Sequence, residues 1–405
     1  MSRRGKRYRE PSEPTFLTLR VESLVFGGAG LAHAPDGRVV FVAFAAPGEL
    51  VEAQVEREYP DYLEAVTTKV IEPSPDRVDP PCPLFGECGG CQLQHMSYPA
   101  QLAAKEAIVR EQLRRIGRLD DSVVRPIAGA AQPFGYRNHL RFSTGKKYGD
   151  VGYITRRGYG LLKVESCPIA DPWVSALLPA LQGHGGGLHQ IQVRHSAETG
   201  TYLINPAVPG LEIETGQKSY IEELAGRRFE VSASAFFQVN HAQAEQMVRL
   251  VGEALPQSGR LLVDGFAGVG TFAVIFADRF ERVLAIEESH SAAKDSEVNL
   301  AQAPNVEMLV GKVEDILPGL DERPDAIVLD PPRPGCAPPV TRAILEFQPQ
   351  TVVYVSCNPA TLARDLRLLV EGGYRLDWVT PLDMFPQTGH IECVSKLTFV
   401  GSAAS

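Results

Sequence analysis

The sequence predicts an α/β doubly wound domain in the C-terminal part of the chain, preceded by a small N-terminal β-barrel and a β-rich central domain. From about residue 230, short apolar runs alternate with segments of helical spacing, and one run leads into a glycine-rich turn at residues 264–270. Between residues 15 and 73, five short runs of strand character are separated by glycine- and proline-containing turn signals. These patterns predict the doubly wound sheet and the barrel.

The composition bounds the class of protein. The 405 residues suffice for two or three domains, and the apolar content is ordinary for a soluble globular protein. No apolar run approaches the roughly 18 residues of a membrane span, and the basic N-terminus lacks the apolar core of a signal peptide. We therefore expect a cytoplasmic protein without a membrane segment, and nothing in the sequence demands more than a monomer.

The net charge of −9 argues against a nucleic-acid partner, but the charges are unevenly distributed. Residues 1–10 hold five Lys or Arg and one Glu, and residues 101–170 hold thirteen Lys or Arg and six Asp or Glu. A basic face on an acidic body can follow a phosphate backbone; the alternative is an ordinary solvated surface. Basic and aromatic residues also alternate in part of this region, as stacking on bases and contact with phosphates require. They include Tyr136, Arg137, Arg141, Lys146, Lys147, Tyr148, Tyr153, Arg156, Arg157 and Tyr159.

Four cysteines form a candidate metal site. Cys82, Cys88 and Cys91 lie close together around a Gly-Gly pair, and Cys167 lies farther along the chain. Four thiolates suit a zinc ion or an iron–sulfur cluster. Zinc sites usually combine two close pairs, so a close triplet with one distant cysteine favours the cluster. Disulfides are the remaining alternative, which a cytoplasmic location disfavours.

The glycine turn at residues 264–270 indicates a nucleoside-binding site. It follows a predicted strand and opens a helix, so a ligand can approach the backbone there. Glu287 ends the next strand, where an acid can accept both ribose hydroxyls. The pair fits NAD or S-adenosylmethionine. The spacing departs from the pyrophosphate-binding pattern, which favours S-adenosylmethionine.

A single thiol follows a predicted buried strand, residues 351–355. Cys357 stands where this strand ends, and Asn358 and Pro359 precede a predicted helix over residues 360–370. In open α/β sheets ligands bind at the carboxyl ends of the strands, and amides at a helix start can lower the pKa of a thiol. Cys357 is therefore a candidate nucleophile; the alternative is a buried structural cysteine.

Two carboxylates complete the candidate site. Asp330 ends another predicted strand and begins the sequence Asp-Pro-Pro-Arg, in which Arg333 replaces the aromatic residue typical of amino-methyltransferases. With a thiol on the next strand, this favours methylation at carbon. Carbon 5 of uracil becomes nucleophilic only after a thiolate adds to carbon 6, and a base must later remove the carbon 5 proton. Glu392, within an apolar run, is the candidate base; the alternative is a surface carboxylate.

These motifs together resemble the RNA uracil-5-methyltransferase family, and most of all the bacterial iron–sulfur members that act on 23S ribosomal RNA. Residues 15–73 resemble the TRAM domain of RNA-modifying enzymes. The matching motifs are the four cysteines, Phe-Phe-Gln at 236–238, the glycine turn after Asp264, Asp-Pro-Pro-Arg at 330–333, Ser-Cys-Asn-Pro at 356–359 and His-Ile-Glu at 390–392.

The resemblance implies a class I methyltransferase fold, with Cys357 as nucleophile and Glu392 as base. It implies an S-adenosylmethionine site formed by Gln238, Phe266, Thr271, Glu287 and Asp330. It implies a 4Fe-4S cluster held by Cys82, Cys88, Cys91 and Cys167. The substrate expected from it is 23S ribosomal RNA. A transfer RNA T-loop uridine is the alternative substrate, and a non-catalytic RNA-binding protein is the alternative function.

The resemblance also sets the expected domain division. Residues 1–14 form a basic disordered tail and residues 15–73 the barrel. Residues 74–99 and 117–229 form the central iron–sulfur and RNA-binding domain. Residues 100–116 and 230–405 form the methyltransferase domain.

Overall fold

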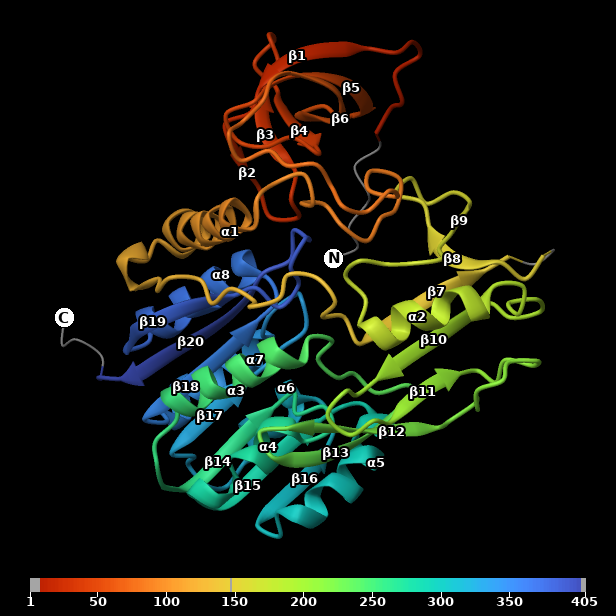
Figure 1. Ribbon diagram of the computed structural model, residues 1–405. Coiled ribbons are helices and arrows are strands. Elements are labelled where there is room, and N and C mark those ends of the chain that lie inside the picture. Colours follow the sequence, from red (N-terminus) through yellow and green to blue (C-terminus); the bar gives the residue numbers. More distant parts are fainter. Residues whose placement is uncertain (1–7, 146–147, 402–405) are drawn as a thin grey trace. The chain divides into compact units, whose positions relative to one another are not determined.

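The computed structural model describes residues 8–145 and 148–401 in two compact units. The first unit consists of Met1–Ile108, Ile154–Leu162 and Phe385–His390, and the second of Val109–Tyr153, Lys163–Met384 and Ile391–Ser405. Figure 1 shows the elements of both units. Residues 1–7 of the expected tail, and Lys146 and Lys147, lie outside the described residues.

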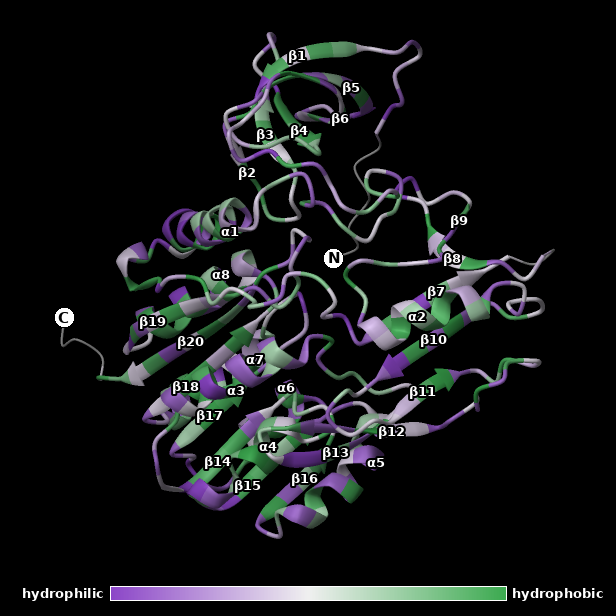
Figure 2. Cartoon of the chain, in the orientation of Figure 1, coloured by the Kyte–Doolittle hydropathy of each residue, from purple (hydrophilic) through white to green (hydrophobic). Residues whose placement is uncertain are grey.

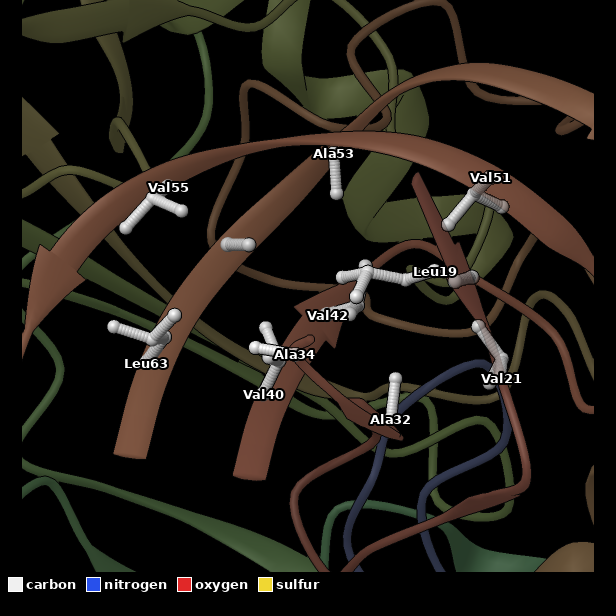
Figure 3. Close-up of a cluster of buried hydrophobic side chains, with 12 residues drawn as sticks. Leu19, Val21, Ala32, Ala34, Val40, Val42, Val51, Ala53, Val55 and Leu63 are labelled. Carbon is white, nitrogen blue, oxygen red and sulfur yellow. The ribbon is translucent and has the colours of Figure 1, made fainter. Parts of the chain in front are cut away.

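A six-stranded sheet forms the N-terminal part of the first unit. Its strands are β1 (Phe16–Arg20), β2 (Ser23–Leu24), β3 (Gly30–His33), β4 (Val39–Ala43), β5 (Leu50–Glu58) and β6 (Tyr62–Glu72), in the order β1-β5-β6-β4-β3-β2. Alternate residues of each strand point inward, as a period of two dictates. Figure 3 shows their side chains meeting in one apolar core, with Leu19, Val40 and Val51 fully buried. The predicted barrel is thus confirmed with one more strand than expected.

The barrel also holds part of the expected tail. The backbone N–H of Arg9 donates to the carbonyl of Glu58 at 2.9 Å, and the N–H of Glu58 donates back to Arg9 at 2.9 Å. Residues 8–14 form no strand, yet this pair of hydrogen bonds attaches them to the end of β5.

The segment Phe385–His390 belongs to the first unit although it lies near the C-terminus. The side-chain amide of Gln101, in α1 (Tyr98–Gln112), donates to Oε1 of Gln387 at 3.0 Å, and the N–H of Gln92 donates to the carbonyl of Gln387 at 3.0 Å. The N–H of Gly27 donates to the carbonyl of Gly389 at 3.2 Å. A Cβ atom at Gly389 would overlap the Gly27 backbone, so only glycine fits there.

The second unit contains the predicted doubly wound sheet. Its strands are β14 (Gly259–Gly265), β15 (Phe280–Glu287), β16 (Val306–Val310), β17 (Ala326–Leu329), β18 (Thr351–Ser356), β19 (Tyr374–Leu382) and β20 (Glu392–Phe399), in the order β16-β15-β14-β17-β18-β20-β19. The first five in this order are parallel, whereas β20 runs antiparallel to both β18 and β19. Every residue of β17 and β18 is buried, as expected for parallel strands covered on both faces, and Figure 2 shows their mostly hydrophobic residues.

Helices alternate with these strands. They are α3 (His241–Ala254), α4 (Thr271–Ile275), α5 (His290–Asn299), α6 (Val313–Ile316), α7 (Pro338–Phe347) and α8 (Pro359–Glu371), with short 3-10 turns η3 (Ala277–Arg279), η4 (Leu300–Gln302) and η5 (Leu317–Gly319). Helix α8 begins at a proline, and the side chain of Asn358 caps it by accepting from the N–H of Ala360 at 3.1 Å. The turn after Cys357 therefore ends the strand and starts the helix, as predicted.

The central strands form two smaller sheets. One contains β7 (His139–Thr144), β8 (Val151–Ile154), β9 (Leu161–Lys163), β10 (Gln190–His195) and β11 (Tyr202–Asn205), and the other β12 (Ser219–Leu224) and β13 (Arg227–Ser232). Three short helices accompany them: η1 (Leu113–Gly117), η2 (Asp121–Val123) and α2 (Pro172–Leu181). The predicted strands near residues 140, 152, 191 and 201 are all present.

One predicted helix is shorter than expected. The apolar run from Thr271 to Phe280 predicts a continuous helix, but α4 ends at Ile275 and Phe280 begins β15. Phe280 pairs with Gly259 in the parallel ladder, where a Cβ atom on the glycine would lie only 2.7 Å from the Phe280 ring. Pairing between distant segments therefore overrides the local helical preference. Among the described residues, no helix combines the length and apolar character needed to cross a bilayer.

Candidate active site

The candidate residues meet at the carboxyl edge of the large sheet. Asp330 directly follows β17, and Cys357 directly follows β18, its parallel neighbour. Strand β20 is antiparallel to β18, so its first residue, Glu392, lies at the same edge. Ser356 is opposite Cys393 in the register, and Cys357 and Glu392 are the residues that follow this last pair on the two strands. Directly opposed residues in an antiparallel pair have neighbouring side chains, so the thiol and the carboxyl are brought together.

The Cys357 thiol is half-buried, and its pKa is raised to about 11. Burial is the largest cause, followed by the negative charges of Glu392 and Asp330, while Arg333 lowers the pKa. The prediction that helix amides lower the pKa of this thiol is therefore wrong. The start of α8 is close in sequence, but burial and two carboxylates outweigh it.

The pKa values of both carboxyls beside the thiol are raised. Glu392 is only 7% exposed, which excludes the alternative of a surface carboxylate. Burial raises its pKa well above the ordinary value, the charge of Asp330 raises it further, and Arg333 lowers it. Burial also raises the pKa of Asp330 to about 6. Arg333 is thus the cation that stabilises negative charge on both Cys357 and Glu392.

The loop that carries Arg333 is fastened to the start of α8. The side chains of Asn358 and Thr361 donate to the carbonyl of Arg333 at 3.2 and 3.1 Å. The buried carboxylate of Asp365 accepts from the N–H of Cys336 at 2.9 Å and from the Tyr354 hydroxyl at 2.7 Å. These bonds tie the loop after Asp330 to the helix that follows Cys357.

A pocket of about 520 Å³ adjoins the glycine turn. Four of the five predicted cofactor residues line it: Gln238, Phe266, Thr271 and Asp330. The fifth, Glu287, lies at the end of β15 and accepts from the N–H of Gly268 at 2.8 Å and from the N–H of Ser289 at 2.7 Å. The pocket and the acid thus share Gly268, which lines the pocket and binds the acid.

The buried Asp264 fixes the glycine turn. Its Oδ2 accepts from the N–H of Ala273 at 2.8 Å, which joins the end of β14 to the start of α4. Burial, together with the charges of Asp330 and Glu287, raises its pKa to about 8, although the hydrogen bond from Ala273 acts in the opposite direction.

Comparison with known proteins decides the family. A family profile described as "tRNA (Uracil-5-)-methyltransferase" matches residues 217–399, and a TRAM domain profile matches residues 15–68. An uncharacterized RNA methyltransferase of Thermosynechococcus vestitus is 36% identical, over 94% of this chain and 98% of its own length. The chain belongs to the tRNA (uracil-5-)-methyltransferase family. It is accordingly an RNA methyltransferase with a TRAM domain.

Further comparisons agree with this family. An uncharacterized RNA methyltransferase of Halalkalibacterium halodurans is 33% identical to this methyltransferase, over 94% of this chain and 96% of its own length. Among solved structures, the tRNA (uracil-54, C5)-methyltransferase of Pyrococcus abyssi, in complex with S-adenosyl-L-homocysteine, superposes with a TM-score of 0.74. It is 25% identical, and the match covers 94% of this chain and 99% of that one. The class I methyltransferase fold predicted from the sequence is thereby confirmed.

Sequence reasoning noted Phe236 and Phe237 as part of a motif but missed other apolar walls of the methyltransferase's pocket. The walls that it missed include Leu224, Ala244, Met247, Val248 and Phe272. The helical spacing of Ala244, Met247 and Val248 in α3 marks a buried face and was the available signal. Leu224, in β12, comes from a distant segment, and no pattern in the sequence indicated that it would line the pocket.

The predicted metal-binding cysteines divide between the units. Cys82, Cys88 and Cys91 lie in the first unit, and Cys167 lies in the second, in the turn before α2. Cys88 and Cys91 line a cavity of about 380 Å³. In the described chain, the group of potential ligands whose atoms lie within 4.8 Å of one another is Glu198, Glu222 and His241, without the cysteines.

Proposed function

We propose that this methyltransferase transfers a methyl group from S-adenosylmethionine to carbon 5 of a uridine in 23S ribosomal RNA. The observation that carries the proposal is that Cys357, at the end of β18, lies close enough to Glu392, at the start of β20, and to Asp330 for both carboxyls to raise its pKa. One thiol and one buried carboxyl serve the two halves of a single reaction: addition to the ring and its reversal.

The pocket beside the glycine turn supports S-adenosylmethionine as the methyl donor. Its mostly apolar walls suit a sulfonium ligand without phosphates, and Glu287 stands where a ribose-binding acid is expected. The Pyrococcus abyssi relative was solved with the demethylated form of the same molecule. When bound, S-adenosylmethionine supplies an electrophilic methyl group. Gln238, Phe266, Thr271 and Asp330 would hold it, with Glu287 on the ribose.

The residues of this chain would act on the uracil in two stages. The Cys357 thiol gives up its proton to water, its sulfur forms a bond to carbon 6, and the ring becomes an enolate. Carbon 5 then forms a bond to the methyl group as the methyl–sulfur bond of the donor breaks, which would leave S-adenosylhomocysteine. Glu392 removes the proton from carbon 5, the carbon 6–sulfur bond breaks, and the electron pair returns to Cys357. Because the pKa of Glu392 is raised, its carboxylate is a stronger base than an exposed one.

Burial raises the pKa of the Cys357 thiol, so the thiolate must form during the reaction. Arg333 favours the thiolate, and a uracil that enters beside it replaces water around the reacting atoms. A uracil within folded RNA must leave its stack to reach Cys357, so the mechanism requires base flipping.

The preference for 23S ribosomal RNA is supported by the likeness of the cysteine pattern and TRAM domain to the iron–sulfur members of the family. Transfer RNA is the alternative, because the Pyrococcus abyssi relative acts on uridine 54 of transfer RNA. The enzyme would work as a cytoplasmic monomer, with the domain division predicted from the sequence.

The four cysteines would hold a 4Fe-4S cluster with a structural role, because no step of this reaction needs an electron. The arrangement of a close triplet with one distant cysteine supports the cluster over a zinc site built from two close pairs. Anaerobically purified protein should contain iron and sulfide and absorb visible light. A colourless protein with one zinc per chain would contradict the cluster.

The central test compares substrates and one variant. Purified enzyme is incubated with S-adenosylmethionine labelled in its methyl group and with transcripts of 23S ribosomal RNA or transfer RNA. We expect label in the ribosomal transcript as 5-methyluridine, and none with Cys357→Ala, which should still bind S-adenosylmethionine. Full activity of Cys357→Ala would refute the mechanism, label in transfer RNA alone would refute the substrate, and no label in any RNA would favour a non-catalytic RNA-binding protein.

A further inference from the structure

We propose that the turn between β8 and β9, residues 155–160, is an RNA-contact site in which Tyr159 stacks on an unpaired base and Arg157 contacts a phosphate. The inference rests on the assignment of the chain as an RNA methyltransferase. It names a surface of the first unit that neither the family assignment nor the chemistry at Cys357 requires.

The turn presents its aromatic residue to solvent. Gly158 and Gly160 have φ values of 81° and 83°, in the region that favours glycine, and they flank Tyr159. The N–H of Gly158 donates to the carbonyl of Thr155 at 2.8 Å, and the hydroxyl of Thr155 donates to the carbonyl of Tyr159. These bonds close a tight tip. Tyr159 is 79% exposed, more than any other large apolar or aromatic side chain in the described part of the chain.

The two arginines of the turn have different roles. Arg156 is 25% exposed, and its two terminal nitrogens each lie 2.7 Å from a different oxygen of Glu56 in β5. This forked geometry anchors the turn to the barrel. Arg157 is 67% exposed and makes a single contact with Glu56 at 3.0 Å. An exposed ion pair of this kind is weak and screened by salt, so a phosphate can take the place of Glu56 at Arg157.

The cysteine loop supports the base of the turn. The N–H of Arg156 donates to the carbonyl of Glu87 at 2.7 Å, and Thr155 forms an antiparallel bridge with Cys88. The segment that holds Cys82, Cys88 and Cys91 therefore fixes the residue next to Arg157. The exposed tip is thus hydrogen-bonded to the cysteine loop at its base.

The chemistry of the turn fits single-stranded RNA. Residues 154–162 contain two arginines and no acidic residue. Stacking of bases on exposed aromatic rings, combined with arginine contacts to the backbone, is how proteins bind unpaired nucleotides. A tyrosine ring at a glycine-flanked tip has both faces available for a base. Ile154, at the base of the turn, is exposed as well and widens the apolar surface.

The test measures RNA binding without any methyl donor. A fluorescein-labelled, uridine-rich single-stranded RNA is titrated with the full-length protein, and anisotropy gives Kd. We expect Tyr159→Ala to weaken binding about tenfold and Tyr159→Phe to leave it unchanged, because the ring and not the hydroxyl stacks. Arg157→Ala should weaken binding about fivefold and reduce the salt slope by about one. The control Arg260→Ala removes an equally exposed arginine (72%) at the start of β14 and should have no effect.

Cross-linking provides the second measurement. The same RNA carrying 5-iodouridine is irradiated with the protein, and the joined peptide is identified by mass spectrometry. A cross-link within residues 154–162 supports the site. Cross-links only elsewhere, or Tyr159→Ala and Arg157→Ala binding within twofold of the wild type, would overturn it. The titration contains no methyl donor and measures binding alone, so failure of the methylation chemistry would leave the binding result intact.

Discussion

The protonated state of Cys357 yields a quantitative prediction. The pKa of this thiol is about 11, against an ordinary value of 9.0, which is a difference of two units. Each unit changes the thiolate fraction tenfold, so below pH 9 the native thiol should hold about 100-fold less thiolate than the same thiol in the unfolded chain. Only the thiolate reacts with alkylating agents.

The assay is alkylation of Cys357 by iodoacetamide, followed peptide by peptide with mass spectrometry from about pH 7 to about pH 10.5. The same cysteine in urea is the matched control. In urea the rate should level off above the ordinary pKa, while in the native enzyme it should still rise at the upper end of the range. The pH dependence decides, because half-burial also slows the reaction at every pH. A native rate that levels off near or below pH 9 would refute our account of the site.

Four further predictions follow from other contacts. Arg333→Met should slow both alkylation of Cys357 and methyl transfer, because the cation that lowers the pKa of the thiol is lost. Arg333→Lys should largely keep both rates. Equal rates in the Met and Lys variants would contradict the role of Arg333 as this cation. Glu392→Gln should accumulate a covalent RNA adduct, seen as a slow band on a denaturing gel, and release at the normal rate would remove Glu392 from its role as base. Burial raises the folded-state pKa of Asp264 to about 8, above its ordinary 3.8, so the stability that its protonated form contributes is fully present below the ordinary pKa and is lost as pH rises through about 8. Asp264→Asn should flatten the fall of Tm between these two pH values. An unchanged slope of Tm against pH would contradict this account of Asp264. Asp365→Asn should lower the free energy of unfolding, measured by denaturation, by about 1–3 kcal/mol, because two hydrogen bonds to the buried carboxylate are weakened. It should also reduce kcat more than the affinity for S-adenosylmethionine, measured by calorimetry. A normal kcat would show that the loop after Asp330 is positioned without Asp365.

Local pattern sufficed for the strands that are buried on both faces. The runs at residues 306–310, 326–329 and 351–356 are short, apolar and bounded by turn residues, and each is a strand within a residue of the predicted ends. Strand β19 went unpredicted, because Arg375 and Asp377 interrupt its apolar pattern and Pro381 lies near its end. It is a strand because it pairs with β20 over its whole length, a long-range contact that no local window contains.

The site shows the same division. Cys357 and Asp330 were placed at the carboxyl edge by the rule that governs parallel strands. The pKa of Cys357 was predicted in the wrong direction, because burial, which raises it most, depends on tertiary packing. Glu392 and Asp330, which raise it further, come from distant segments, and the sequence around the thiol contains only the helix start. Likewise, the hydrogen bond from the N–H of Cys336 to the carboxylate of Asp365 depends on the packing of α8, which cannot be read from sequence spacing.

The segment Phe385–His390 limits how this enzyme can be truncated or divided into separate domains. It is held by glycine-on-glycine packing and by the amides of Gln92 and Gln101 in the first unit, and only Ile391 separates it from Glu392. A truncation that removed the N-terminal residues would remove the hydrogen-bond and packing partners of this segment, which lies two residues before Glu392 in the chain. A chimaera that exchanged the RNA-binding modules between relatives would have to exchange residues 385–390 with them, because the anchor for the strand carrying Glu392 is encoded at the opposite end of the gene.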